Sequence, residues 1–172
     1  IFVGYNAGTS NTIGDENVAI GHAALLANVA GSKSTAIGQG ALNAQNKASD
    51  AAGDQHNTAV GYHAGVAVSE AVDNTLIGSI AGDSLNTGGN NTAVGKQALS
   101  ADTKGGTAVA IGQLALGAQN FTDAMDNYNV AIGYSAGVGI AAAGGHIAGR
   151  FNTLIGGLAG DNITTGDSNI II

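Results

Sequence analysis

The chain has no cysteine, no proline and no tryptophan, and only 10% of its 172 residues are charged. The lack of cysteine excludes a disulfide framework and thiolate metal sites. No run of about 18 apolar residues is present, so we expect no membrane insertion. The five basic residues are dispersed and the net charge is −7, which argues against nucleic acid as a partner. What the chain has in abundance is glycine, with 29 residues, among small aliphatic side chains.

A short motif, seen in its fullest form at residues 74–82, recurs along the whole chain. Its central glycine is found at Gly4, Gly21, Gly38, Gly61, Gly78, Gly95, Gly112, Gly133 and Gly156. The spacings are 17, 17, 23, 17, 17, 17, 21 and 23 residues, so a 17-residue unit is interrupted three times. Helical repeats need about 33 residues or more. The short period predicts an all-β fold, a parallel β-solenoid (β-roll) of about ten 17-residue coils.

Each copy of the motif has two β-branched positions, one on either side of a residue that is usually alanine. The residue before the glycine is always Ile or Val, and the residue two positions earlier is Thr, Val or Ile. Side chains two apart share one face of a strand, so we expect both columns to point into the core. The isoleucines of this predicted inward column are Ile20, Ile37, Ile77, Ile111, Ile132 and Ile155.

The small residues between these columns would then face outward and pack against other chains, together with a leucine column. A thin coil of small side chains buries little apolar surface compared with the entropy of ordering it, so burial between chains is expected. The residues assigned to this packing are Ala19, Ala36, Ala59, Ala93, Ala110, Ala131, Leu25, Leu42, Leu99 and Leu116.

An asparagine opens most copies of the motif. Stacked asparagine side chains form hydrogen bonds from one strand to the next. The column therefore predicts a structural ladder along the solenoid, with the members Asn57, Asn74, Asn91, Asn129 and Asn152.

A longer period of four coils is superimposed on the 17-residue unit. Residues 41–46, for example, return in similar form as residues 115–120. The chain starts and stops part-way through this longer unit. We therefore expect residues 1–172 to be a single section of a longer fibre, cut within a repeat at both ends.

The copies at 17–21, 57–61 and 129–133, each with an alanine three residues after the glycine, resemble the head repeats of trimeric autotransporter adhesins and the related repeats of phage tail fibres. The resemblance covers all ten units. It implies a left-handed β-roll that assembles into a parallel homotrimeric rod, located outside the cell on a bacterial surface or a virion fibre. The implied function is a structural or adhesive, non-catalytic fibre module for surface attachment, with a host-surface glycan or protein as partner.

Motifs that would indicate chemistry have weaker support. Residues 133–137 match the G-x-S-x-G nucleophile elbow, but Ser135 shares its column with His63 and Ile80, so we expect no enzyme. The histidines have no carboxylate at a fixed spacing, which argues against zinc. No cofactor is expected, with calcium as the alternative because aspartates recur beside turn glycines. These aspartates are Asp15, Asp83, Asp161 and Asp167.

Two other functions are compatible with a β-solenoid. An ice-binding solenoid needs a flat outward threonine array, whereas the threonines here share the parity of the predicted core column. The trunk of a glycan depolymerase needs paired carboxylates in a cleft.

The interruptions at 46–54, 121–127 and 141–150 predict loops that project from the rod. Binding residues concentrate on loops above rigid scaffolds. The candidate binding residues in or beside these loops are Phe121, Met125, Tyr128, His146, Arg150 and Phe151. Tyr5, Tyr62 and Tyr134 recur after the motif glycine, and we expect them to pack beneath loops, with a glycan-stacking column as the alternative.

Overall fold

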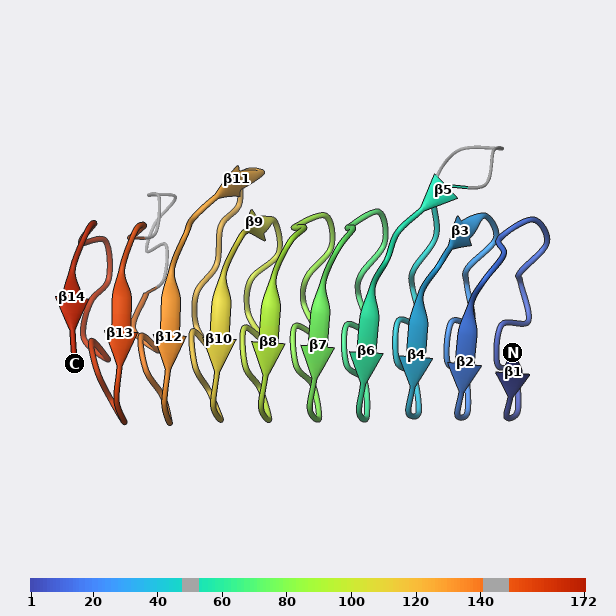
Figure 1. Cartoon of the computed structure of the whole chain (residues 1–172), viewed down its shortest axis with the longest axis horizontal. Coiled ribbons are helices and arrows are strands. Elements are labelled where there is room, and N and C mark those ends of the chain that lie inside the picture. Colours follow the sequence, from blue (N-terminus) through green and yellow to red (C-terminus); the bar gives the residue numbers. More distant parts are fainter. Residues whose placement is uncertain (48–52, 141–148) are drawn as a thin grey trace.

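The structure is a computed structural model that describes residues 1–47, 53–140 and 149–172. These residues form a parallel β-solenoid of about nine turns, which confirms the fold class predicted from the 17-residue period. Figure 1 shows a rod in which the chain winds from the N-terminus at one end to the C-terminus at the other. The described residues contain no helix, and so none that could span a membrane.

One ten-stranded parallel sheet runs the length of the rod, and each strand is taken from one copy of the motif. In order across the sheet, the strands are β1 (Phe2–Val3), β2 (Val18–Ile20), β4 (Thr35–Ile37), β6 (Thr58–Val60), β7 (Thr75–Ile77), β8 (Thr92–Val94), β10 (Val109–Ile111), β12 (Val130–Ile132), β13 (Thr153–Ile155) and β14 (Ile170–Ile171). Partners occupy the same motif position, as Thr75 and Thr92 do between β7 and β8. The sequence repeat therefore becomes columns of like residues.

Two smaller parallel sheets lie at one edge of the rod, as Figure 1 shows. β3 (Gly31–Ser32) pairs with β5 (Gly53–Asp54), and β9 (Gly105–Gly106) pairs with β11 (Met125–Asp126). β5 and β11 belong to two of the three predicted interruptions. The described extra residues of these two interruptions thus lie in the turn just before the next motif, and the main sheet continues past them without a break.

In the eight three-residue strands of the main sheet the residue that faces the core is the middle one, so the predicted parity is wrong. The buried middle residues are Ala19, Ala36, Ala59, Leu76, Ala93, Ala110, Ala131 and Leu154. The isoleucines predicted to point inward lie on the outward face, where their exposed fractions are Ile20 38%, Ile37 37%, Ile77 38%, Ile111 37%, Ile132 36% and Ile155 38%. The alanines assigned to packing between chains are instead inside the coil.

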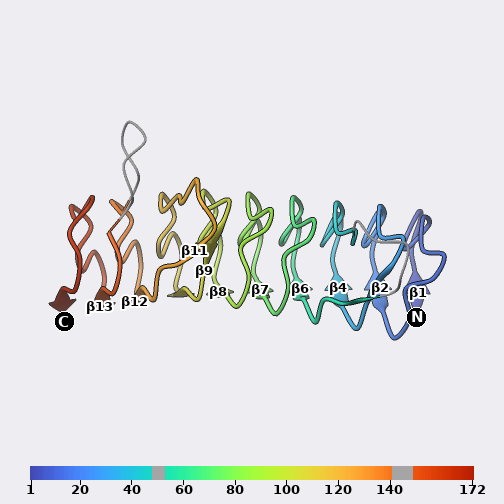
Figure 2. The same cartoon turned by 90° about the horizontal axis from the view of Figure 1, so that it is seen from above.

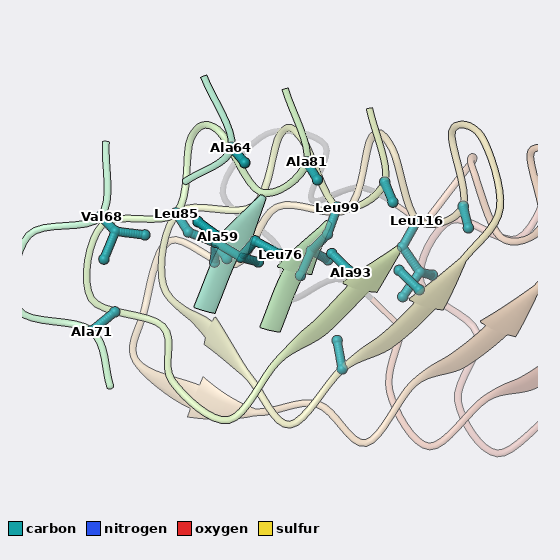
Figure 3. Close-up of a cluster of buried hydrophobic side chains, with 14 of the residues drawn as sticks. Ala59, Ala64, Val68, Ala71, Leu76, Ala81, Leu85, Ala93, Leu99 and Leu116 are labelled. Atoms are coloured by element: carbon teal, nitrogen blue, oxygen red, sulfur yellow. The ribbon is translucent and has the colours of Figure 1, made fainter. Parts of the chain in front are cut away.

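The thinness of the coil explains this parity. Figure 3 shows Ala59, Leu76 and Ala93 of the strands lying among Ala64 and Ala81 of the following turns. All of these side chains are fully buried in one continuous cluster. A β-branched pair on the inside would not fit between strand and turn, whereas β-branched residues suit either face of a strand.

The four-coil period arises from size complementarity inside the rod. The position four residues after the motif glycine is Leu or Gly, and both have a positive φ. Where it is glycine, a larger strand residue fills the space: a Cβ on Gly65 or Gly82 would lie 2.7 or 2.8 Å from the side chain of Leu76. Where it is leucine, the side chain is fully buried, so the predicted packing of this column between chains is also wrong. These residues are Leu25, Leu42, Leu99 and Leu116.

Candidate functional site

The asparagine column links each coil to the next. The backbone N–H of Asn74 donates to Asn57 Oδ1 at 3.0 Å, and the N–H of Asn91 donates to Asn74 Oδ1 at 2.9 Å. Asn74 Nδ2 also donates to the Gly88 carbonyl oxygen at 3.0 Å. Asn129 and Asn152 continue the pattern near the other end and, like the first three, are buried. These contacts give the column a structural role.

A second buried polar cluster surrounds Asp102. Its Oδ1 accepts hydrogen bonds from the N–H groups of Gly105 and Phe121, both at 3.0 Å, and its Oδ2 accepts one from Gln119 Nε2 at 2.7 Å. Gln119 Oε1 in turn accepts from Asn129 Nδ2 at 2.9 Å. Burial raises the pKa of the Asp102 carboxyl group, and the hydrogen bonds oppose that shift. The cluster is closed to solvent and fixes the start of the second interruption.

The residue just before the asparagine position forms a column on the surface, which we call the corner column. Its φ lies between 50° and 62° in every coil, a left-handed conformation that side chains other than Gly and Asn rarely adopt. The members are Glu16, Lys33, His56, Asp73, Asn90, Thr107, Tyr128, Phe151 and Ser168, and all except Thr107 are exposed. A constant backbone thus carries highly varied side chains.

Charged members of the corner column pair on the surface. Lys33 Nζ lies 2.8 Å from Asp54 Oδ2, and His56 lies 3.8 Å from Asp54 and 3.4 Å from Asp73. The hydrogen bond between Lys33 and Asp54 lowers the pKa of the carboxyl group and raises that of the ammonium group. Pairs exposed to solvent contribute little to stability, so this group decorates the surface.

Aromatic members of the corner column stack on each other. The rings of Tyr128 and Phe151 lie 5.4 Å apart between centroids, at 12° to each other. The side chains are 51% and 48% exposed. The guanidinium carbon of Arg150 lies 5.4 Å from the centroid of the Phe151 ring, within the range of a cation–π contact. Such a pair of exposed rings with a cation beside it is a candidate binding feature.

An open cleft of about 300 Å³ lies next to this aromatic pair. The residues that line it include Thr87, Asn90, Lys104, Met125 and Asp126, together with Gly89 and Gly106. The Tyr128 hydroxyl donates to Asp126 Oδ2 at 3.3 Å, so Asp126 connects the cleft with the aromatic pair. We call the cleft together with Tyr128, Phe151 and Arg150 the corner site.

The predicted binding residues are only partly brought together. Met125, Tyr128, Arg150 and Phe151 belong to the corner site. Phe121 is only 2% exposed and belongs to the core, so its selection as a candidate binding residue is wrong. His146 lies outside the described residues.

The tyrosines that follow the motif glycine do not pack beneath loops, contrary to the prediction. Tyr5, Tyr62 and Tyr134 are 74%, 50% and 55% exposed. Tyr5 stacks on His22 and Tyr62 on His63, with ring centroids 5.6 and 4.1 Å apart. The aspartates considered for calcium do not gather, since the described part of the chain has no group of three or more potential acidic or histidine ligands.

Sequence reasoning missed Thr87, Asn90, Lys104 and Asp126 as members of the corner site. They are up to 39 residues apart in the chain and meet because successive coils stack. One signal was available: Asn90 and Tyr128 occupy the same position relative to the motif, two coils apart. Comparison with protein-family models, with curated proteins and with solved structures finds no match for this chain.

Proposed function

We propose that this chain is an extracellular fibre module, on a bacterial surface or a virion, that assembles as a parallel homotrimer and has a structural and adhesive, non-catalytic role. One observation carries the proposal. The outward face of the ten-stranded sheet is an unbroken strip of uncharged, mostly β-branched side chains, which we call the outward strip. Its Ile and Val members stand beside the motif glycine, with Thr, Val or Ile two residues earlier.

The outward strip favours burial against copies of the same chain. The six isoleucines beside the motif glycine in β2, β4, β7, β10, β12 and β13 are 36 to 38% exposed. The column lies in register on adjacent strands, so it forms a continuous apolar surface along the rod. A long exposed apolar patch on a soluble protein marks an interaction surface. Because each coil repeats the same columns, parallel copies match along their whole length. The similarity of the motif to trimeric adhesin head repeats favours three copies.

The test is the mass of the assembly in solution. Sedimentation equilibrium of the wild-type chain should give the mass of three chains. The double variant Ile77→Lys/Ile111→Lys places two charges on the outward strip and should give mainly single chains, because burying unpaired charges is costly.

The matched control adds the same charge elsewhere. Gln39→Lys/Ser168→Lys uses exposed positions whose columns already hold Lys96 and Lys33, and it should still give three chains. A wild-type chain that stays single at every concentration would refute the proposed assembly.

Ice binding is a second candidate because the threonine column faces outward, against the predicted parity. Thr35, Thr58, Thr75 and Thr92 are paired in register on four adjacent strands, at the roughly 4.8 Å spacing of a sheet. Ice binding needs this face free, whereas the trimer covers it. Thermal hysteresis of the wild-type chain, measured at a concentration where its mass is known, separates the two; no hysteresis eliminates ice binding.

A further inference from the structure

The corner site combines two features that are each incomplete as a binding surface. The cleft has a mainly polar lining, and Thr87, Asn90, Lys104 and Asp126 are among the residues that line it. Its volume of about 300 Å³ is at the lower end for small-molecule sites. The stacked rings of Tyr128 and Phe151 next to it leave about half of each side chain accessible.

Backbone geometry holds the two features together. A Cβ on Gly106 would lie 2.8 Å from Asp126 Oδ1, so the absence of a side chain there lets the carboxylate lie across the coil below. Asp126 Oδ2 accepts the hydrogen bond from the Tyr128 hydroxyl at 3.3 Å. Thr107 Oγ1 donates to the Gly106 carbonyl oxygen at 2.6 Å and accepts from the Tyr128 N–H at 3.3 Å. The left-handed backbone at Tyr128 is therefore fixed by the preceding coil.

The chemistry of the corner site matches a sugar ring. The C–H face of a sugar packs on an aromatic ring, and its hydroxyl groups need donors and acceptors in a shallow, polar cleft. Asp126 supplies acceptors, Lys104 supplies donors, and Asn90 supplies both. The lining is too polar for an apolar ligand. The net charge of −7 disfavours polyanions, so a neutral saccharide fits better than an acidic one.

We propose that the corner site binds a neutral saccharide, with one ring in the cleft and the adjoining ring against Tyr128 and Phe151. The inference rests on the proposed adhesive function and names its ligand class. All described contributing residues come from one chain, so the site does not require the trimer to be complete. The corner column precedes β12 and β13 by two residues and is distinct from the outward strip.

The binding experiment uses isothermal titration of the wild-type chain with four neutral probes: maltohexaose, cellohexaose, mannohexaose and the hexamer of N-acetylglucosamine. An oligogalacturonate of the same length is the acidic comparison. We expect at least one neutral probe to bind and the oligogalacturonate to bind at least about tenfold more weakly. If none of the neutral probes binds, or if the acidic probe binds best, the inference is wrong.

The variants Tyr128→Asn and Phe151→Asn test the location. Asparagine already occupies the same left-handed position at Asn90, where φ is 60°, so both variants should fold. Each should weaken binding of the best probe by about tenfold, the loss expected for one aromatic contact. Tyr128→Phe keeps the ring but removes the hydroxyl group that contacts Asp126, so it should weaken binding less.

The matched control is His56→Asn, which makes the same kind of change in the corner column but outside the corner site. It should bind like the wild type. Equal binding by wild type and Tyr128→Asn/Phe151→Asn would place the sugar elsewhere and overturn the inference. The mass of each sample in solution keeps the two proposals distinguishable, since a single chain that binds sugar refutes only the trimer, and a trimer that binds none refutes only the saccharide site.

Discussion

At the scale of single residues, the motif glycine is required by both its conformation and its surroundings. Gly78 has φ of +135°, and a Cβ there would lie 2.5 Å from the Gly95 carbonyl oxygen of the next coil. Gly156 has nearly the same conformation, with φ of +127°, but the nearest atom to its added Cβ is Ala159 Cβ at 3.9 Å. An alanine would therefore be strained in its backbone at either position, but only at Gly78 would its Cβ also clash with the next coil.

We predict that Gly78→Ala destabilises the chain more than Gly156→Ala. Backbone strain of about 1–3 kcal/mol is expected in both variants, and only Gly78→Ala adds a backbone clash that must separate two coils. Chemical denaturation of both variants measures the difference. Equal losses of unfolding free energy would mean that conformation alone selects glycine at this position.

Also at this scale, the buried carboxyl group of Asp102 predicts a pH dependence. Because burial raises its pKa in the folded chain, the folded state binds more protons than the unfolded state between the two pKa values, and stability falls as pH rises through that window. Asp102→Asn removes the titration. The melting temperature of Asp102→Asn minus that of the wild type should therefore increase as pH rises through the window.

The control for this prediction is Asp123→Asn, an exposed aspartate whose replacement causes the same change in net charge. Its melting temperature relative to wild type should shift less with pH. Thermal unfolding monitored by circular dichroism gives the melting temperatures of both variants and the wild type at each pH. If the difference between Asp102→Asn and wild type changes with pH as little as that of the control, the role assigned to Asp102 is refuted.

At the scale of the strand, the finding that matters is parity: Ala93 is buried, and its neighbour Thr92 lies on the outward strip of β8. The natural lack of cysteine allows a direct test with single-cysteine variants. In dilute, dissociated chains, Ala93→Cys should react with a thiol reagent at least about 100-fold more slowly than the same chain unfolded, because reaction requires local opening.

Thr92→Cys should react readily in the dissociated chain and become protected as the concentration rises and the outward strip is covered. The urea-unfolded variants provide the control rate for each thiol. If the cysteine at position 93 reacts fast and the cysteine at position 92 reacts slowly in single chains, residue 92 faces the core and the assignment of the two faces is wrong.

At the scale of the whole molecule, the rod separates three roles. Figure 2 shows the strands of the main sheet along one side of the rod and turns on the other. The outward strip repeats without interruption, whereas the corner column changes its side chains from coil to coil. Repetition suits assembly along the rod, and variation suits recognition at one place on it. The two proposals therefore use different columns of the same coils.

The sequence alone determined the coil and its contacts along the axis. A 17-residue period with a glycine in each copy specifies parallel stacking, because equivalent residues must lie above one another. The ladder positions of Asn57, Asn74 and Asn91 could be derived in the same way, since a column in the alignment becomes a column in space.

Only the tertiary structure decided what faces inward and what meets at the corner. Period two identifies two faces of a strand but not which one is buried, and the thickness of the coil selected Ala93 over Thr92 and Val94. The corner site depends equally on three-dimensional contacts, because Lys104 and Asp126 meet only through stacking of their coils. Local pattern sets the repeat, whereas burial and proximity depend on the space that neighbouring coils leave.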